Sequence, residues 1–308
     1  MTLRVAVGAS SFGARDETPI RMLEQAGIEV KLNPHKRRMN EEETVEHLAE
    51  VDGLIAGLEP LNEKVLASAV PRLKVVARVG IGMNNVDREA AERLGVKVSN
   101  TPEPPTQAVA ELTVTAALAL LRGLVGSNQA MHAGQWKKVI GKGLIDTPVL
   151  LVGYGRIGRK TGEYLRAFGA RLLVCDPALS PGDLEHGERL VTLEEGLAEA
   201  EMISLHAAGA ETILGPAQFE LMREGVYLLN SARGELVDEA ALVAALESGR
   251  VAGVWFDAFW QEPYEGRLTE FDQALLTPHV CTYSAQCRLN METEAARNVM
   301  RDLGVGPA

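Results

Sequence analysis

The sequence of 308 residues has few cysteines, few aromatic residues and no excess of positive charge. Cysteines occur only at positions 175, 281 and 287, too few for a disulfide framework, and none has zinc-ligand spacing with a histidine pair. We therefore expect reduced thiols and no metal site. Lysine and arginine number 31 against 42 aspartates and glutamates, a formal net charge of −11. Because such a surface repels phosphate backbones and anionic lipid, we expect no nucleic acid and no membrane as partners.

Long apolar runs are missing as well. Residues 1–13 contain no long apolar stretch and no cleavage-like signal, and the apolar stretch at 112–121 is stopped by Arg122 before it could span a bilayer. These features predict a cytoplasmic protein. With 46% hydrophobic and 24% charged residues, the chain is expected to be globular, and its length is about right for two domains.

Short β-rich runs alternate with helical patterns along the chain. The first hundred residues contain five predicted strands, at 3–9, 28–33, 53–58, 74–80 and 96–100. A second series follows at 148–155, 171–177, 201–207, 225–232, 251–259 and 274–279. Strand–helix alternation is typical of parallel sheets joined by crossover connections. We therefore expect an α/β fold with two doubly wound parallel-sheet domains, Rossmann-like or flavodoxin-like, and a cleft between them.

The prolines at 100–105 indicate a domain boundary, because they end a predicted strand ahead of a long helix expected from about Gln107 to Leu124. The last helix, expected at about 286–303, follows the second strand series and can return to the first domain. One domain is thus expected to comprise 1–101 and 284–308, and the other 102–283.

The strongest local signal is the segment VGYGRIG. Gly153, Gly155 and Gly158 have G-x-G-x-x-G spacing between a predicted strand and a predicted helix. The first glycine allows a tight turn, the second lets the backbone approach a pyrophosphate, and the third lets the helix pack on the strand. Asp176 ends the next predicted strand, where a carboxylate can bind both ribose hydroxyls and would repel a 2′-phosphate. The pattern predicts that 102–283 binds NAD rather than NADP.

A second glycine loop, RVGIGMNNVD, follows the predicted strand at 74–80. It contains Gly80 and Gly82 but lacks the third glycine and a suitable ribose acid, so it does not predict a dinucleotide site. Its backbone N–H groups, together with Arg78, can bind a small anion. A tight strand–helix turn without a ligand is the alternative.

Three predicted strands of the second series are followed by polar residues: Arg233, then Asp257 with Glu262, then His279. Ligands of a doubly wound sheet bind beyond the carboxyl ends of its strands, so these side chains can converge. A guanidinium can bind a substrate carboxylate through two hydrogen bonds, an imidazole can exchange a proton with the reacting oxygen, and a carboxylate can orient the ring. Singly, Arg233 can be a surface ion pair, Glu262 a turn residue, and His279 a structural histidine.

The segments VARVGIGMNNVD, VSNTPEPPTQAVAELT, VGYGRIG, NSARGELVDEAAL, GVWFDAFWQEP and LLTPH occur in this order. Together they resemble the D-isomer-specific 2-hydroxyacid dehydrogenase family over nearly the whole chain, and its 3-phosphoglycerate dehydrogenase-like branch most. The resemblance implies an NAD-dependent oxidoreductase that interconverts a small D-2-hydroxy acid and its 2-oxo acid, with or without a phosphate group. It implies that residues 1–101 and 284–308 bind the substrate.

The resemblance also implies roles for individual residues. The catalytic set would be Arg233, Glu262 and His279. The substrate would contact Arg233 and the loop residues Arg78, Gly80, Ile81 and Gly82. The cofactor contacts would be Ile81, Gly153, Gly155, Arg156, Ile157, Gly158, Asp176, Ala207, Ser231, Ala232, Arg233, Asp257 and His279.

Three departures from the family pattern bear on these roles. Val280, Cys281 and Thr282 replace a usual glycine pair, and Ala207 and Ala208 replace a threonine–proline pair. Gly57 stands where 3-phosphoglycerate enzymes of this branch usually carry an arginine, so one phosphate ligand is missing. The run Lys36, Arg37 and Arg38 can compensate, or can be a solvated charge run.

The apolar helix expected at 107–124 and Trp136 exceed what a monomer surface should expose, which predicts a two-fold homodimer through the second domain. Two alternatives to a phosphorylated substrate stay open. One is a dehydrogenase for a non-phosphorylated 2-oxo acid such as glyoxylate or hydroxypyruvate. The other is an NAD-sensing binding module, similar to the corepressors of the family, which keep the catalytic set.

Overall fold

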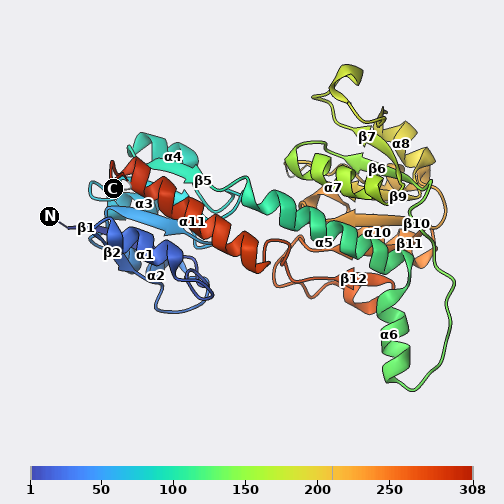
Figure 1. Cartoon of the computed structure of the whole chain (residues 1–308), viewed down its shortest axis with the longest axis horizontal. Helices are drawn as coiled ribbons and strands as arrows, with labels where there is room; N and C mark the ends of the chain where they lie inside the picture. The colour runs from blue at the N-terminus through green and yellow to red at the C-terminus, as the bar shows by residue number, and fades with distance from the viewer. Residues whose placement is uncertain (1, 210, 307–308) are drawn as a thin grey trace. The chain divides into compact units, whose positions relative to one another are not determined.

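The computed structural model of the chain describes residues 2–209 and 211–306. The chain divides into two compact units: unit 1 joins the chain up to Pro105 with the chain from Tyr283 onward, and unit 2 spans Thr106–Thr282. Figure 1 labels most of the helices and strands of both units, and each unit is described by itself below.

Unit 1 contains a five-stranded parallel sheet in the order β2-β1-β3-β4-β5. Its strands are β1 (Leu3–Val7), β2 (Ile28–Lys31), β3 (Gly53–Ala56), β4 (Val75–Arg78) and β5 (Lys97–Asn100). Its helices are α1 (Thr18–Gln25), α2 (Glu41–His47), α3 (Glu63–Ala69), α4 (Arg88–Arg93) and α11 (Ala285–Asp302). All five predicted strands are present. Helix α4 was not predicted.

The central strands of unit 1, β3 and β4, are buried on both faces. In β3, Leu54 and Ala56 pack in a cluster with residues of α3 and α4, such as Leu66 and Ala90. Gly53 faces α11 instead, because a Cβ atom at this position would lie 3.3 Å from a methyl group of Val299. Helices α1 and α11 therefore cover one face of the sheet, and α2, α3 and α4 cover the other.

Unit 2 contains a seven-stranded parallel sheet in the order β12-β11-β10-β9-β6-β7-β8. Its strands are β6 (Pro148–Val152), β7 (Arg171–Cys175), β8 (Arg189–Leu190), β9 (Met202–Leu205), β10 (Val226–Asn230), β11 (Val251–Phe256) and β12 (Ala274–Leu276). Its helices are α5 (Pro104–Leu121), α6 (Leu124–His132), α7 (Arg156–Ala167), α8 (Leu193–Glu199), α9 (Pro216–Leu221) and α10 (Glu239–Glu247), with short 3₁₀ turns η1 (Pro181–Asp183), η2 (Gly234–Leu236) and η3 (Arg267–Glu270). The six predicted strands are present, and the two-residue β8 is additional.

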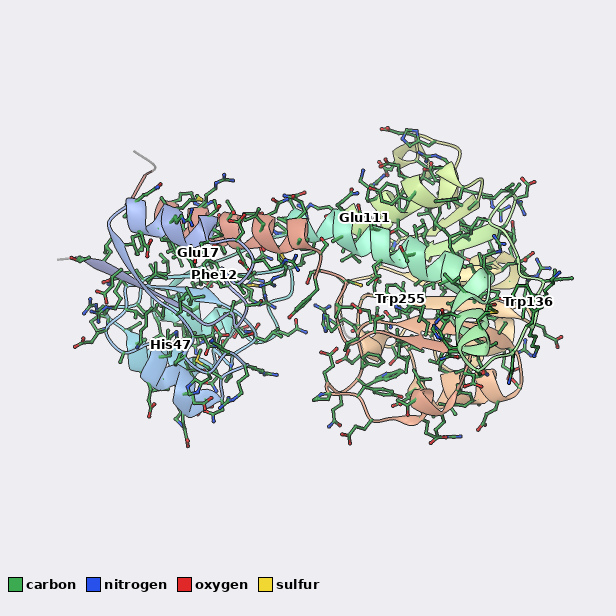
Figure 2. All side chains as sticks on the ribbon, turned by 60° about the horizontal axis from the view of Figure 1, so that its bottom comes forward. Phe12, Glu17, His47, Glu111, Trp136 and Trp255 are labelled. Atoms are coloured by element: carbon green, nitrogen blue, oxygen red, sulfur yellow. The ribbon has the colours of Figure 1, made fainter. Side chains whose placement is uncertain are left out.

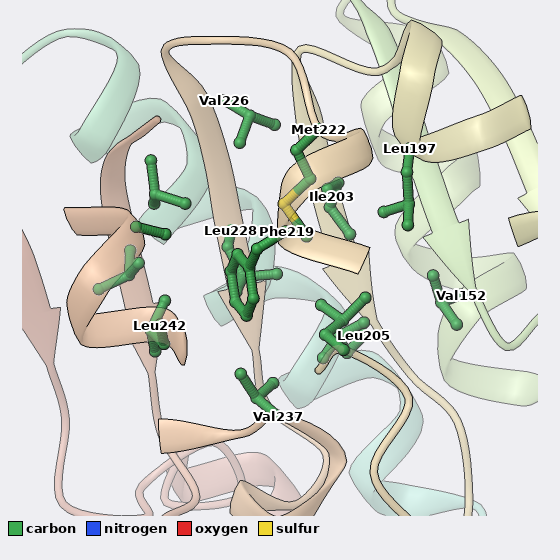
Figure 3. Packing of buried hydrophobic residues seen from close by; sticks show 14 of the residues in the cluster. Val152, Leu197, Ile203, Leu205, Phe219, Met222, Val226, Leu228, Val237 and Leu242 are labelled. Atoms are coloured by element: carbon green, nitrogen blue, oxygen red, sulfur yellow. The ribbon is translucent and has the colours of Figure 1, made fainter. Parts of the chain in front are cut away.

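Apolar side chains fill both faces of this sheet, as the unbroken apolar sequences of its central strands require. On one face, Phe219 of α9, Met222 just after it and Leu242 of α10 pack over Ile203 and Leu228 of the sheet (Figure 3). On the other face, helices α5 and α7 pack over buried residues of β6, β7 and β11. The sheet is thus a rigid frame for the loops at its edges.

The long helix expected from Gln107 to Leu124 is two helices. Helix α5 ends at Leu121, Gly123 has a left-handed φ of 55°, and α6 continues after a bend of 63°. Most apolar side chains of α5, including Val109 and Val114, are buried within unit 2. The exposed apolar surface expected on this helix therefore lies further along the chain, on α6 and the connection after it.

Among the described residues, no single helix is long and apolar enough to cross a membrane, and only the bent pair α5–α6 reaches that length and composition jointly.

Strand order reverses at one point in each sheet, between β1 and β3 in unit 1 and between β6 and β9 in unit 2. In open parallel sheets, the loops after the strands diverge at such a point and leave a crevice that binds ligands. Each unit therefore has a defined edge at which to look for a site.

Candidate active site

The three glycines of VGYGRIG form a loop at the switch point of unit 2. Gly153 has a φ of 88°, and a Cβ atom on it would lie 2.6 Å from the backbone nitrogen of Ala207, in the loop after β9. A Cβ atom on Gly158 would lie 2.3 Å from the carbonyl oxygen of Gly153. Gly155, which precedes α7, has no atom within 4 Å of its Cβ position. The loop is therefore packed against protein on two sides and open on the third, as a backbone that contacts a pyrophosphate must be.

Asp176 lies at the end of β7, next to this loop. Its Oδ2 accepts a hydrogen bond from the backbone N–H of Tyr154 at 2.7 Å, and its Oδ1 accepts one from Ala178 at 2.9 Å. Each carboxylate oxygen has a further lone pair to accept a ribose hydroxyl. The two bonds fix the carboxylate next to the glycine loop.

The buried side chain of Tyr154 holds the glycine loop in place. It is 4% exposed, and its hydroxyl donates to Glu188 at 2.9 Å. Burial, followed by the hydrogen bond to Glu188, raises the pKa of Tyr154 to about 12. Glu188 also accepts a hydrogen bond from Arg166 of α7 at 2.7 Å. The glycine loop is thus connected to both the β7–β8 segment and the helix that follows it.

The first residues of α7 and the end of β9 complete this part of the site. Arg156 is the first residue of α7, and Ile157 packs against the apolar cluster beneath that helix. After β9, His206 forms a 2.9 Å hydrogen bond with the hydroxyl of Ser204. Burial lowers the pKa of His206 to about 4, so its ring is neutral near pH 7. The donor set, the open Gly155 and the carboxylate at the end of β7 fit a dinucleotide cofactor.

Arg233 lies in the loop after β10, in a turn fixed by Asn230. The Asn230 side chain is buried, donates to the Arg233 carbonyl at 2.8 Å and accepts from the Ala232 N–H at 3.0 Å. The Arg233 guanidinium donates to the Ala232 carbonyl at 2.7 Å. The hydroxyl of Ser231 lies 3.5 Å from that of Thr113 on α5. Sequence reasoning missed Asn230, although its place at a strand end before Ser-Ala-Arg was a usable signal.

His279 and Glu262 form a direct pair. The His279 Nδ1 lies 2.9 Å from each carboxylate oxygen of Glu262, and both side chains are about half-exposed. Because Nδ1 faces the carboxylate, Glu262 leaves the second ring nitrogen, Nε2, available for another partner. The backbone N–H of Phe259 also donates to Glu262 at 3.2 Å, which orients the carboxylate.

The loops that carry Arg233 and Glu262 contact each other at Gly234. A Cβ atom on Gly234 would lie 2.3 Å from the backbone nitrogen of Trp260 and 2.4 Å from the carbonyl carbon of Phe259. Only glycine fits this close approach. The structure thus joins the segments of Arg233, Glu262 and His279 at one edge of unit 2, and sequence reasoning did not identify the contact at Gly234.

The second glycine loop lies at the carboxyl edge of the sheet in unit 1. Arg78 is 9% exposed, and its guanidinium lies over Gly80, whose φ is 125°. The Gly80 N–H donates to the Thr101 hydroxyl at 2.7 Å, and the Asn100 side chain donates to the Ile81 carbonyl at 2.8 Å. These bonds give the loop from Arg78 to Gly82 a fixed shape within unit 1.

Comparison with known proteins assigns the chain to a family. A model for the NAD binding domain of D-isomer specific 2-hydroxyacid dehydrogenases matches residues 114–281. The glyoxylate reductase of Thermococcus litoralis is 32% identical over 270 residues, which cover 83% of this chain and 82% of that protein. The D-3-phosphoglycerate dehydrogenase of Sus scrofa is 33% identical over 280 residues, which cover 88% of this chain and 52% of that protein. This chain thus spans about half the length of that second relative.

Two solved structures are similar to this chain over nearly its whole length. The TT0316 protein from Thermus thermophilus is 31% identical, with a TM-score of 0.89 over 99% of this chain and 98% of that one. A glyoxylate reductase from Paecilomyes thermophila is 27% identical, with a TM-score of 0.85 over 97% and 94% of the two chains.

The fold and the glycine-loop site define an NAD-dependent oxidoreductase. The chain belongs to the D-isomer-specific 2-hydroxyacid dehydrogenase family, so its substrates are a 2-hydroxy acid and the corresponding 2-oxo acid. The resemblance inferred from the motifs and the expected α/β fold of two parallel sheets are therefore confirmed.

The partly buried His206 predicts acid sensitivity of the fold. Its pKa is lowered from 6.5 to about 4, so the unfolded chain binds a proton that the folded chain does not. Stability is therefore lost as the pH falls from about 6.5 toward 4. Between pH 7 and pH 5, we expect the free energy of unfolding of wild type to fall by about 1 kcal/mol more than that of His206→Gln. This difference is smaller than the full pKa shift would give, because the His206 side chain keeps some exposure to solvent. Urea titrations measure this, with the exposed His132→Gln as the control. Equal losses in wild type and His206→Gln would contradict it.

Proposed function

We propose that the protein transfers a hydride between NAD and C2 of a small, non-phosphorylated 2-hydroxy acid, either glycolate, which has no chiral centre, or a D-acid of the glycerate kind. The observation that carries the proposal is the His279–Glu262 pair at 2.9 Å, on the same edge of unit 2 as Arg233 and the glycine loop. An oriented imidazole next to a carboxylate-binding guanidinium is the arrangement that a 2-hydroxy acid requires.

Arg233, His279 and Glu262 each have one role in the proposed reaction. When bound, NAD⁺ supplies the hydride acceptor. Arg233 binds the substrate carboxylate, which places the 2-hydroxyl group toward the imidazole. In the oxidative direction, His279 accepts the hydroxyl proton at Nε2, and in the reductive direction it returns that proton to the oxygen. Glu262 accepts the Nδ1–H hydrogen bond and stabilises the imidazolium that forms.

The residues that follow strand β3, together with the ion pair of Arg37, favour a substrate without phosphate. Strand β3 is followed by Gly57 and by Glu59, whose carboxyl group is fully buried and accepts the Gly57 N–H at 3.0 Å. Burial raises the pKa of Glu59, and neither protonation state supplies a positive charge. Arg37, a candidate to compensate, donates to both carboxylate oxygens of Glu43 at 2.9 and 2.6 Å. A phosphate dianion needs several strong donors, whereas a single carboxylate can be met by one arginine such as Arg233.

A turnover assay with NADH tests this substrate class. The panel compares glyoxylate, hydroxypyruvate and 3-phosphohydroxypyruvate at equal concentrations. We expect a higher kcat/KM for a non-phosphorylated acid. A higher value for the phosphorylated acid would contradict the charge argument, and NADH binding without turnover of any 2-oxo acid would favour the NAD-sensing module.

Replacing His279 by glutamine should lower kcat by about 100-fold or more, the usual scale of general acid–base catalysis. The Kd of NADH should change little, because the proposed cofactor contacts lie mainly at the glycine loop and Asp176. Glu262→Gln should lower kcat less than His279→Gln does, because the imidazole that exchanges the proton is retained. Stopped-flow and steady-state kinetics measure both effects, with His186→Gln, in an exposed loop, as the control. Near-wild-type turnover of His279→Gln would refute the acid–base assignment.

Cofactor preference should follow from Asp176. A 2′-phosphate would meet the carboxylate that Tyr154 and Ala178 fix at the end of β7, so we expect NADH to exceed NADPH in kcat/KM by about 10-fold or more. Asp176→Ser should lower the ratio of kcat/KM with NADH to kcat/KM with NADPH. Glu185→Gln, which removes an exposed acid further along the chain, should leave this ratio unchanged. Comparable efficiencies of wild type with both cofactors would show that Asp176 does not select between them.

We also propose a homodimer formed through unit 2. Large apolar side chains are exposed on α6 and the connection after it: Leu124, Met131, Trp136 (80% exposed), Ile140 and Ile145 (79% exposed). Trp136 lies at the periphery of unit 2 (Figure 2). An apolar surface of this kind is typical of an interface between subunits. We expect light scattering to give the mass of a dimer at micromolar concentration and Trp136→Glu to shift the mass toward the monomer. A stable wild-type monomer would overturn this proposal.

A further inference from the structure

The backbone of His279 has a conformation that residues other than glycine rarely adopt. Its φ is 53°, in the left-handed region, where a Cβ atom crowds the following carbonyl group. The residue lies in a tight turn after β12, in which its N–H donates to the Thr277 carbonyl at 2.9 Å. Such a turn persists only when surrounding groups keep it in place.

The Asp257 carboxylate is the group that keeps this turn in place. Its Oδ1 accepts hydrogen bonds from the Thr277 hydroxyl at 2.6 Å and from the Val280 N–H at 2.9 Å. Its Oδ2 accepts the Cys281 N–H at 2.9 Å. The three donors lie on both sides of His279 in the sequence, so one carboxylate ties the entry and the exit of the turn together.

The carboxylate itself is fixed by the sheet. Asp257 directly follows β11, is 1% exposed, and donates its N–H to the Asn230 carbonyl at 3.0 Å. The Thr277 hydroxyl, in turn, accepts a hydrogen bond from the indole N–H of the fully buried Trp255 at 3.0 Å. A continuous hydrogen-bonded path therefore runs from the core of unit 2 through Thr277 and Asp257 to the His279 turn. Because the group is buried, water competes little for these bonds.

We propose that Asp257 is a positioning residue for the acid–base group: it fixes the backbone of His279, while Glu262 fixes the ring. The proposal rests on the role given to His279 above. The resemblance to the family implies a cofactor contact at Asp257, and the three hydrogen bonds give its carboxylate a further task.

Asp257→Asn tests the proposal with little change in shape. An amide offers one acceptor oxygen, and its NH₂ group would face an N–H donor, so at least one bond to the turn is lost. We expect amide hydrogen exchange at Val280 and Cys281 to become about 10-fold faster or more. Exchange at the core amides of Ile203 and Leu228 should change much less. Asp272→Asn, at an exposed aspartate, is the matched control. Unchanged exchange at Val280 and Cys281 in Asp257→Asn would overturn the proposal.

Kinetics separate this task from cofactor binding. Asp257→Asn should lower kcat at saturating NADH by about 10-fold or more, and should lower it little further in the His279→Gln background, because both changes act through one imidazole. The proposal would be overturned if a higher Kd of NADH accounted for the whole loss of activity and if that loss were equally large in wild type and in His279→Gln. Full turnover of His279→Gln would refute the proposed function, whereas unchanged exchange refutes only this inference, so the two failures are distinguishable.

Discussion

The parallel pairing of β10, β11 and β12 is the constraint on which the candidate site depends. In this register, Asn230 at the end of β10 lies opposite Phe256 of β11, and Phe256 lies opposite Leu276 of β12. The chain therefore leaves all three strands at the same edge of the sheet, within a few residues of Arg233, Asp257 and His279. A guanidinium, a carboxylate and an imidazole from segments far apart in the sequence are brought together without any need for a long or flexible loop. Buried side chains on both faces of the sheet make that edge rigid, as a site that orients a proton donor requires.

Close backbone contacts then set the loops in place. Gly153 touches the loop after β9, and Gly234 touches the loop after β11, so a Cβ atom is excluded at either position. Buried polar side chains act in the same way: Asn230 fixes the Arg233 turn, and Asp257 fixes the His279 turn. The residues proposed to meet the substrate are thus the exposed ends of short hydrogen-bonded networks whose other ends lie in the core. This arrangement explains how half-exposed side chains such as that of His279 keep a defined geometry.

Much of the fold and of the candidate site could be predicted from the sequence, because both leave local patterns. The apolar runs indicated the strands, and the glycine spacing with Asp176 indicated the cofactor edge. The two-residue β8, which is too short to show a period, and the six-residue α4 were missed. The break between α5 and α6 was missed because one glycine inside an apolar helical pattern does not reveal its φ. The network around Asp257 joins residues 20 to 24 positions apart, and no local pattern indicates which donors a buried carboxylate will meet once the strands pair.

The central claim is that hydride passes between the nicotinamide and C2 of a 2-oxo acid. The most direct measurement uses NADH with deuterium at the transferred C4 position, hydroxypyruvate as the acceptor, and NMR with chiral analysis of the product. The account predicts glycerate that carries one deuterium at C2 and has the D configuration. Glycerate without deuterium at C2, or with the L configuration, would contradict it.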